Sequence, residues 1–107
     1  MKSVLVLEDI AETRAWLADA AQAAFPGCTI SEASRISEAA RMISRHSFDL
    51  AIIDLGLPDG NGNDIIAALS SKRPNTVIIV ATVMGDDSSV VGALACGAHG
   101  YLLKDSP

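Results

Sequence analysis

Carboxylate side chains directly follow two of the apolar segments in this sequence. Glu8 and Asp9 come immediately after Val4–Leu7, and Asp54 comes immediately after Leu50–Ile53. Carboxylates that are brought close together repel one another, so they must take up protons or bind a cation. A site made only of oxygen ligands suits Mg²⁺, which keeps several waters and bridges to phosphate. The sequence therefore predicts a magnesium site if these two segments end side by side.

Two further apolar segments end in a hydroxyl and an ammonium group. Thr82 follows residues 77–81, and Lys104 follows residues 101–103. A metal ion and a lysine can neutralise the oxygens of a phosphoryl group, while a hydroxyl binds one of them. A carboxylate can itself act as the nucleophile and form an acyl phosphate. Taken together, these side chains favour phosphoryl chemistry.

The elements that must position these side chains alternate in type along the chain. Apolar runs of strand length occur at 4–7, 50–53, 77–81 and 101–103, and residues 28–32 are expected to form a further short strand. Between them, apolar residues recur at helical spacing, which predicts helices over 12–25, after Ser34, after Asn63 and over 86–96. Ser34 and Asn63 are expected to cap the helices that they precede. The acids from Asp86 onward suit the positive end of a helix dipole.

Alternating strands and helices predict an α/β fold with one parallel sheet, covered by helices on both faces. In such a sheet, ligands bind outside the carboxyl ends of the strands. The doubly wound order 2-1-3-4-5, counting strands along the chain, makes the first and third strands neighbours. Glu8, Asp9 and Asp54 would then lie together at the point where the order reverses.

Composition limits the remaining possibilities. A length of 107 residues suits one domain, residues 1–107, and the net charge of −5 without a run of Lys or Arg argues against direct nucleic-acid binding. No apolar stretch approaches the about 20 residues that a membrane span requires. The sequence shows no signal peptide, so a cytoplasmic location is expected. Cys28 and Cys96 lie far apart, and neither they nor His46 and His99 have the spacing of metal ligands.

Each polar residue at a strand end also has a purely structural interpretation. Asp9 and Glu12 fit a capping box, so the acidic pair could simply begin a helix. Asp54 alone could be a loop residue, and Lys104 alone a solvated charge. The functional interpretation depends on the whole set, because four strands ending in such residues at one edge would be a rare coincidence.

In these motifs the chain resembles the receiver domains of two-component response regulators, over nearly its whole length. The matching pieces are VLVLED with Glu8 and Asp9, DLAIIDLGLPDGNG with Asp54, VIIVAT with Thr82, and GYLLKD with Lys104. The resemblance implies a flavodoxin-like fold. The ending GYLLKDSP resembles receivers that precede a helix-turn-helix DNA-binding domain.

The resemblance implies a role for each matching residue at the acidic site. Asp54 would accept a phosphoryl group from a sensor histidine kinase. Asp9 and Asp54 would bind Mg²⁺ directly, together with the backbone carbonyl of Gly56, and Glu8 would act on the metal mainly through water.

The resemblance also implies a switch. Lys104 would contact the phosphoryl group, Thr82 would move to bind it, and Tyr101 would change rotamer with Thr82. This is a population shift that a local charge biases. Such a protein is not an enzyme beyond catalysing its own phosphorylation and dephosphorylation, and its output would be transcriptional.

The chain departs from the family pattern at several positions. Glu8 replaces the commoner Asp, Val83 stands where a smaller residue is usual and could crowd the phosphoryl site, and Asp105 replaces the usual proline. At the positions that tune hydrolysis, small Gly56 would leave a water path open and bulky Met84 would narrow it. The family's fifth helix would follow residue 107, so we expect this chain to be a piece of a longer protein. Alternatively, the apolar surface that this helix would cover is exposed and favours association as a homodimer.

Three alternatives remain at this stage. A phosphatase that forms an aspartyl phosphate would want a second acid two residues after Asp54, where Gly56 stands. A nucleotide or flavin module would extend the glycines of residues 60–62 into a phosphate loop, but Ile65 stands where a glycine is needed. A pseudo-receiver, which binds proteins without being phosphorylated, stays open because of Val83.

Overall fold

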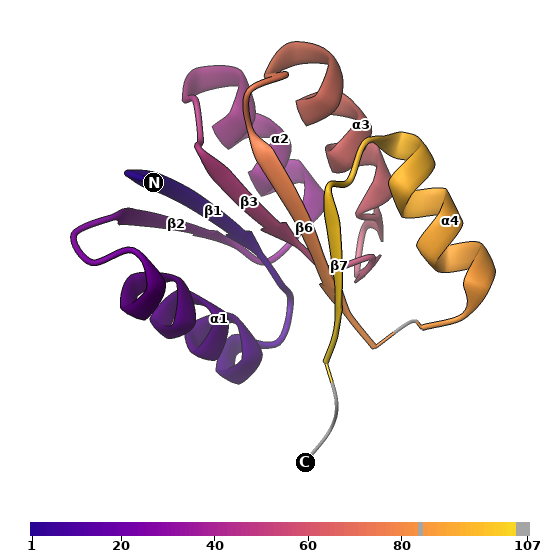
Figure 1. Ribbon diagram of the computed structural model, residues 1–107, viewed down its shortest axis with the longest axis horizontal. Helices are drawn as coiled ribbons and strands as arrows, with labels where there is room; N and C mark the ends of the chain where they lie inside the picture. Colours follow the sequence, from indigo (N-terminus) through magenta and orange to yellow (C-terminus); the bar gives the residue numbers. More distant parts are fainter. Residues whose placement is uncertain (84, 105–107) are drawn as a thin grey trace.

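A computed structural model describes residues 1–83 and 85–104. The elements follow one another as β1 (Ser3–Leu7), α1 (Ala11–Ala24), β2 (Thr29–Ala33), α2 (Ile36–Arg45), β3 (Leu50–Ile53), β4 (Gly56–Leu57), β5 (Gly60–Asn61), α3 (Asn63–Lys72), β6 (Val77–Thr82), α4 (Asp87–Cys96) and β7 (Gly100–Leu103). The structure shows a parallel sheet with α2, α3 and α4 on one face and α1 on the other (Figure 1).

The main sheet has five strands in the order β2-β1-β3-β6-β7, and all neighbouring pairs are parallel. The predicted fold and the doubly wound order are therefore confirmed, with β6 and β7 as the fourth and fifth expected strands. The pair β4 and β5 was not predicted. These two short strands form a separate antiparallel ribbon, with Gly56 opposite Asn61, inside the glycine-rich loop.

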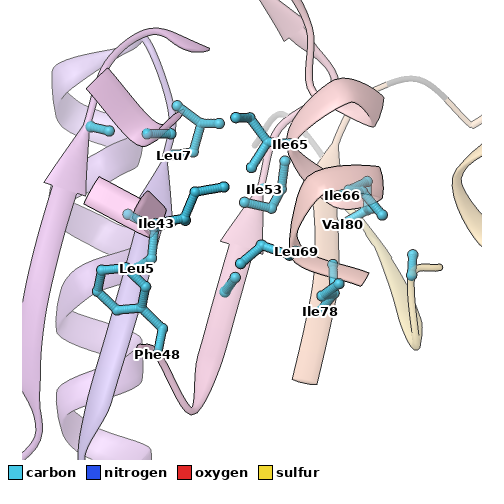
Figure 2. Packing of buried hydrophobic residues seen from close by; sticks show 14 of the residues in the cluster. Leu5, Leu7, Ile43, Phe48, Ile53, Ile65, Ile66, Leu69, Ile78 and Val80 are labelled. Atoms are coloured by element: carbon cyan, nitrogen blue, oxygen red, sulfur yellow. The ribbon is translucent and has the colours of Figure 1, made fainter. Parts of the chain in front are cut away.

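Helices α2, α3 and α4 cover one face of the sheet. Ile65, Ile66 and Leu69 recur at helical spacing on α3 and are all buried. Figure 2 shows Ile65 and Leu69 directed toward Ile53 of β3. Full burial of each such side chain contributes about 1.5–3 kcal/mol. These side chains belong to the larger of two buried apolar clusters in the described residues. The larger cluster holds β3 in place and so positions Asp54, which follows it.

Helix α1 covers the opposite face through Leu17 and Ala21, which pack with Val4 and Val6 of β1. Helix α1 does not extend over the part of this face near β7 (Figure 1). Leu102 pairs with Ala81, a member of the same cluster, yet Leu102 is 48% exposed. Apolar surface is thus accessible on this side of the sheet.

The caps of α2 differ from the expectation. Ser34 does not cap the helix: its N–H and hydroxyl both donate to Glu38, and Arg35 occupies the N-cap position. The carboxylate of Asp59 takes this function instead, accepting from the backbone N–H groups of Ile36 at 2.7 Å and Ser37 at 3.1 Å. The donors at the start of a helix need an acceptor, and here a distant loop supplies it.

The prediction that Asn63 caps α3 was also wrong. Gly62 occupies the N-cap position of α3, with Asn63 as the first helical residue. Ile10, without a side-chain cap, precedes α1, so the capping box that was the structural alternative for Asp9 does not form. Asp86, which the sequence indicated only as an acid suited to the helix dipole, caps α4 by accepting from the backbone N–H of Ser89. At its other end α4 stops at Gly97, whose φ of 119° lies in the left-handed region.

Cys28 is a buried free thiol, and Cys96 is a partly buried one. Among the helices of residues 1–83 and 85–104, none combines the length and the apolar character that crossing a bilayer would require.

Candidate functional site

Strands β1, β3, β6 and β7 end at the same edge of the sheet (Figure 1). The register pairs Leu7 with Ile53 and Thr82 with Leu103. The next residues along the chain, Glu8, Asp54 and Lys104, are therefore brought to one place, as the sequence analysis expected.

The three predicted acids form one cluster. Glu8, Asp9 and Asp54 each place a carboxylate oxygen within 4.8 Å of the others. Glu8 is fully buried and Asp54 is 7% exposed, whereas Asp9 lies at the surface. Burial, opposed by the hydrogen bond from Lys104 and reinforced by Asp9 and the charge of Asp54, raises the pKa of Glu8. The cluster therefore carries more negative charge than its surroundings readily hold.

Lys104 supplies a counter-charge within this cluster. Its Nζ donates to Oε1 of Glu8, and it lies 3.2 Å from Oδ2 of Asp54. Burial works against the charged amine, but the hydrogen bond to Glu8 and the charge of Asp54 outweigh it and raise the pKa of Lys104. Lys104 therefore stays charged, and its ammonium links the carboxylate after β1 with the carboxylate after β3.

Thr82 and Tyr101 lie on the adjacent strands β6 and β7. Thr82 is fully buried, and its carbonyl oxygen accepts from the backbone N–H of Lys104 at 2.8 Å. Tyr101 is half-buried against the larger cluster. Burial, with the charges of Asp86 and Asp54, raises the pKa of its hydroxyl. Both residues are thus close to the acidic edge, and Tyr101 feels the charge of Asp54.

The loop after Asp54 folds back over the strand end. The backbone N–H of Gly56 lies 3.4 Å from Oδ1 of Asp54, and the N–H of Gly62 donates to the carbonyl of Leu55 at 2.9 Å. Gly62 packs so closely that a Cβ there would lie 2.1 Å from the carbonyl oxygen of Asp54. Only glycine allows this approach.

Arg14 is a further neighbour of the acidic cluster that the sequence analysis missed. Its Nη1 donates to the backbone carbonyl of Glu8 at 2.9 Å, and its Nε pairs with Glu32 at 3.3 Å. No sequence pattern links Arg14 to these partners, because the contact depends on how α1 docks beside β2.

The donor set fits a hard divalent cation. The side chains of Glu8, Asp9 and Asp54 offer only oxygen, and Asp9 remains accessible from solvent. Sulfur and imidazole, which would favour zinc or copper, are absent from this cluster of described residues.

The comparison with known families agrees with this geometry. The model of the family described as response regulator receiver domain matches residues 4–107. The chain belongs to this family. Among curated relatives of this receiver domain, the DNA-binding transcriptional activator DevR/DosR of Mycobacterium tuberculosis is 30% identical over 105 residues, which make up 98% of this chain and 48% of that protein. The chain spans about half the length, or less, of the curated relatives that it matches.

Solved structures resemble the receiver closely. A response regulator from Burkholderia pseudomallei, described with a phosphorylated aspartic acid, calcium ion and citrate, has a TM-score of 0.89 and 27% identity over 100% of this chain and 62% of that chain. The response regulator TrrA from Thermotoga maritima, described in complex with Mg(2+)-BeF, has a TM-score of 0.84 and 27% identity over 98% of this chain and 88% of that chain.

The positions where this receiver departs from the family pattern are only partly described. Val83 is 68% exposed, so its side chain is not packed into the core. Met84 and Asp105 lie outside the described residues.

Proposed function

We propose that this receiver domain is a phosphorylation-controlled switch in which Asp54 accepts a phosphoryl group in a Mg²⁺-dependent reaction. The observation that carries the proposal is the environment of Asp54. Its carboxylate lies within 4.8 Å of two further acids and 3.2 Å from the ammonium of Lys104. A phosphoryl acceptor needs this combination of a nucleophile, a cation site and a fixed positive charge.

The proposed step is an in-line transfer. A carboxylate oxygen of Asp54 forms a bond to phosphorus while the bond between phosphorus and the donor's leaving group breaks. The product is an acyl phosphate on Asp54. Lys104 would stabilise the negative charge on the equatorial oxygens, and the hydroxyl of Thr82 would bind one of those oxygens after a small movement of β6.

Glu8, Asp9 and Asp54, with the backbone carbonyl of Gly56, would hold the Mg²⁺. When bound, the ion supplies neutralisation of the phosphoryl oxygens. Asp9 is the accessible member of the set, whereas Glu8 is buried and engaged with Lys104, so Glu8 would act on the metal mainly through water.

The remaining parts of the proposal concern partners. The donor would be a sensor histidine kinase in the cytoplasm, and the Thr82 and Tyr101 pair would transmit the change toward α4 and β7. DNA-binding relatives about twice as long as this chain support a C-terminal transcriptional output domain. A homodimer is part of the same proposal. The chain would catalyse only its own phosphorylation and dephosphorylation.

Other functions have less support from the site. A phosphatase would need a general acid at Gly56, which has no side chain to offer. A pseudo-receiver would have no need of the contact between Asp54 and Lys104, and Val83, which had kept this alternative open, is 68% exposed.

Intact mass after incubation with acetyl phosphate and Mg²⁺ tests the proposal. We expect one added phosphoryl group on the wild type, and none on Asp54→Asn or without Mg²⁺. Asp59→Asn is the matched control, since Asp59 is an acid of the same loop that is occupied with α2, and it should still form the adduct. Absence of any adduct on a folded wild type that binds Mg²⁺ would reject the proposal.

A further inference from the structure

Arg14 contacts the residues that precede and follow Asp9, the surface-exposed acid of the cluster. Its side-chain Nη1 donates to the carbonyl of Glu8 at 2.9 Å, and its backbone N–H donates to the carbonyl of Ile10 at 2.8 Å. Asp9 lies between these two carbonyls in the sequence. The side chain of Arg14 therefore holds the peptide group that precedes Asp9, while its backbone makes the first i to i−4 bond of α1 to Ile10.

This segment has little other support. Asp9, Ile10 and Ala11 are all exposed, so apolar packing does not fix their backbone. The carboxylate of Glu8 accepts from the N–H of Ile10 at 3.3 Å, which is a long contact. The contact of Arg14 with the carbonyl of Glu8 is shorter, at 2.9 Å, and its ionised guanidinium makes it charge-assisted.

Glu32 holds the other side of the guanidinium. Its Oε1 lies 3.3 Å from Nε of Arg14, so the planar fork is fixed between β2 and the end of β1. The negative charge of Glu32 also offsets the positive charge of Arg14, which would otherwise repel a cation from the nearby carboxylates.

We infer that Arg14 is a positioning residue that presents Asp9 to the metal through the backbone of residues 8–10, with Glu32 as its anchor. This inference rests on the proposed Mg²⁺-dependent function. Partners one step behind a ligand orient it, and their loss weakens metal binding. A lysine at this position keeps the charge but cannot donate to Glu8 and Glu32 from two fixed nitrogens at once.

The test is isothermal titration of the chain with Mg²⁺, for the wild type, Arg14→Lys, Glu32→Gln and the control Arg41→Lys. Arg41 is exposed on α2. We expect the Kd for Mg²⁺ to rise about 10-fold in Arg14→Lys and by a smaller factor in Glu32→Gln, with no change in Arg41→Lys. Thermal melting shows that each variant is folded.

A kinetic measurement separates positioning from a general loss of structure. In adduct formation with acetyl phosphate, the Mg²⁺ concentration at half-maximal rate should rise in Arg14→Lys, while the rate at saturating Mg²⁺ stays close to that of the wild type. An unchanged Kd, or a lower maximal rate with an unchanged half-saturating concentration, would overturn the inference and leave the proposed function standing. A wild type that neither binds Mg²⁺ nor forms the adduct would contradict both the inference about Arg14 and the proposed function.

Discussion

At the residue scale, Lys104 has two relationships to the acidic cluster. Its ammonium neutralises part of the charge on Glu8 and Asp54, which allows both to be buried. A buried carboxylate without such a partner would be costly to keep charged. Glutamate at position 8 has one methylene more than aspartate, and its carboxylate, at the end of β1, meets the long side chain of Lys104, which comes from the end of β7. A cation entering the cluster must therefore share these oxygens with Lys104.

Gly62 offers a sharp test of how the loop holds Asp54. In Gly62→Ala the new Cβ would meet the carbonyl oxygen of Asp54 at 2.1 Å, so the backbone of the strand end must shift. We expect destabilisation of about 1–3 kcal/mol and a large loss of phosphoryl uptake, measured by urea denaturation and by intact mass.

Gly92→Ala is the matched control for that substitution. Gly92 lies within α4, and a Cβ there would have its nearest neighbour at 3.9 Å. Alanine should stabilise the helix by roughly 0.5–1 kcal/mol and leave the adduct unchanged. Equal stability of the two variants would show that the loop accommodates a side chain at position 62.

Side chains that follow a strand could be placed from the sequence, because parallel topology determines where strand ends meet. This is why Glu8, Asp54 and Lys104 were predicted together, and the structure brings them together. Contacts that depend on the docking of a helix could not be placed in this way. Arg14 reaches Glu8 and Glu32 only because α1 packs beside β2, and the spacing of residues in the sequence does not indicate this packing.

At the element scale, the helix caps show the same difference between local contacts and contacts that depend on tertiary structure. Asp86, marked in the sequence as an acid at the start of α4, accepts from Ser88 and Ser89, two and three positions later. Asp59 caps α2 from a loop 23 residues away. Ser34 had the right residue type at the right place, but its hydroxyl bonds Glu38 instead. Local propensity is therefore a guide only where no tertiary partner competes.

Asp86 predicts a pH dependence of stability. Hydrogen bonds from the hydroxyl groups of Ser88 and Ser89, and from the N–H of Ser89, lower the pKa of Asp86 to about 2. The unfolded carboxyl has its ordinary pKa of about 3.9. The unfolded state therefore takes up the proton first on acidification, and the stabilisation is complete above about pH 4 and lost as pH falls toward 2.

The measurement is the melting temperature of the wild type and of Asp86→Ala, followed from pH 6 down to the lowest pH, roughly 2.5, at which both fold. The wild type should melt higher at pH 6, and the gap should narrow below about pH 4. Asp19→Ala, which removes an exposed acid of α1, should show a gap that varies far less with pH. A gap that stays constant on acidification would contradict the assigned hydrogen bonds.

At the scale of the whole molecule, the two faces of the sheet are unequally covered. Helices α2, α3 and α4 pack over one face, whereas the side chains of α1 join the cluster on the other face near β1 and β2 (Figure 1). Ile52 and Ile79 lie on this second face and are partly buried, and Leu102 is 48% exposed beside them. Apolar surface of this kind favours association in water.

We therefore expect this chain to self-associate with increasing concentration through the β7 side of that face, as measured by analytical ultracentrifugation. In a symmetric dimer each copy contributes Leu102, so Leu102→Ser should weaken the dimer about tenfold or more, because burying one leucine contributes about 1.5–3 kcal/mol. Leu94→Ser is the matched control, since Leu94 of α4 is also 48% exposed but lies over the opposite face. A wild type that stays monomeric at high concentration, or an equal loss from Leu94→Ser, would mean that the open face of the sheet does not drive association.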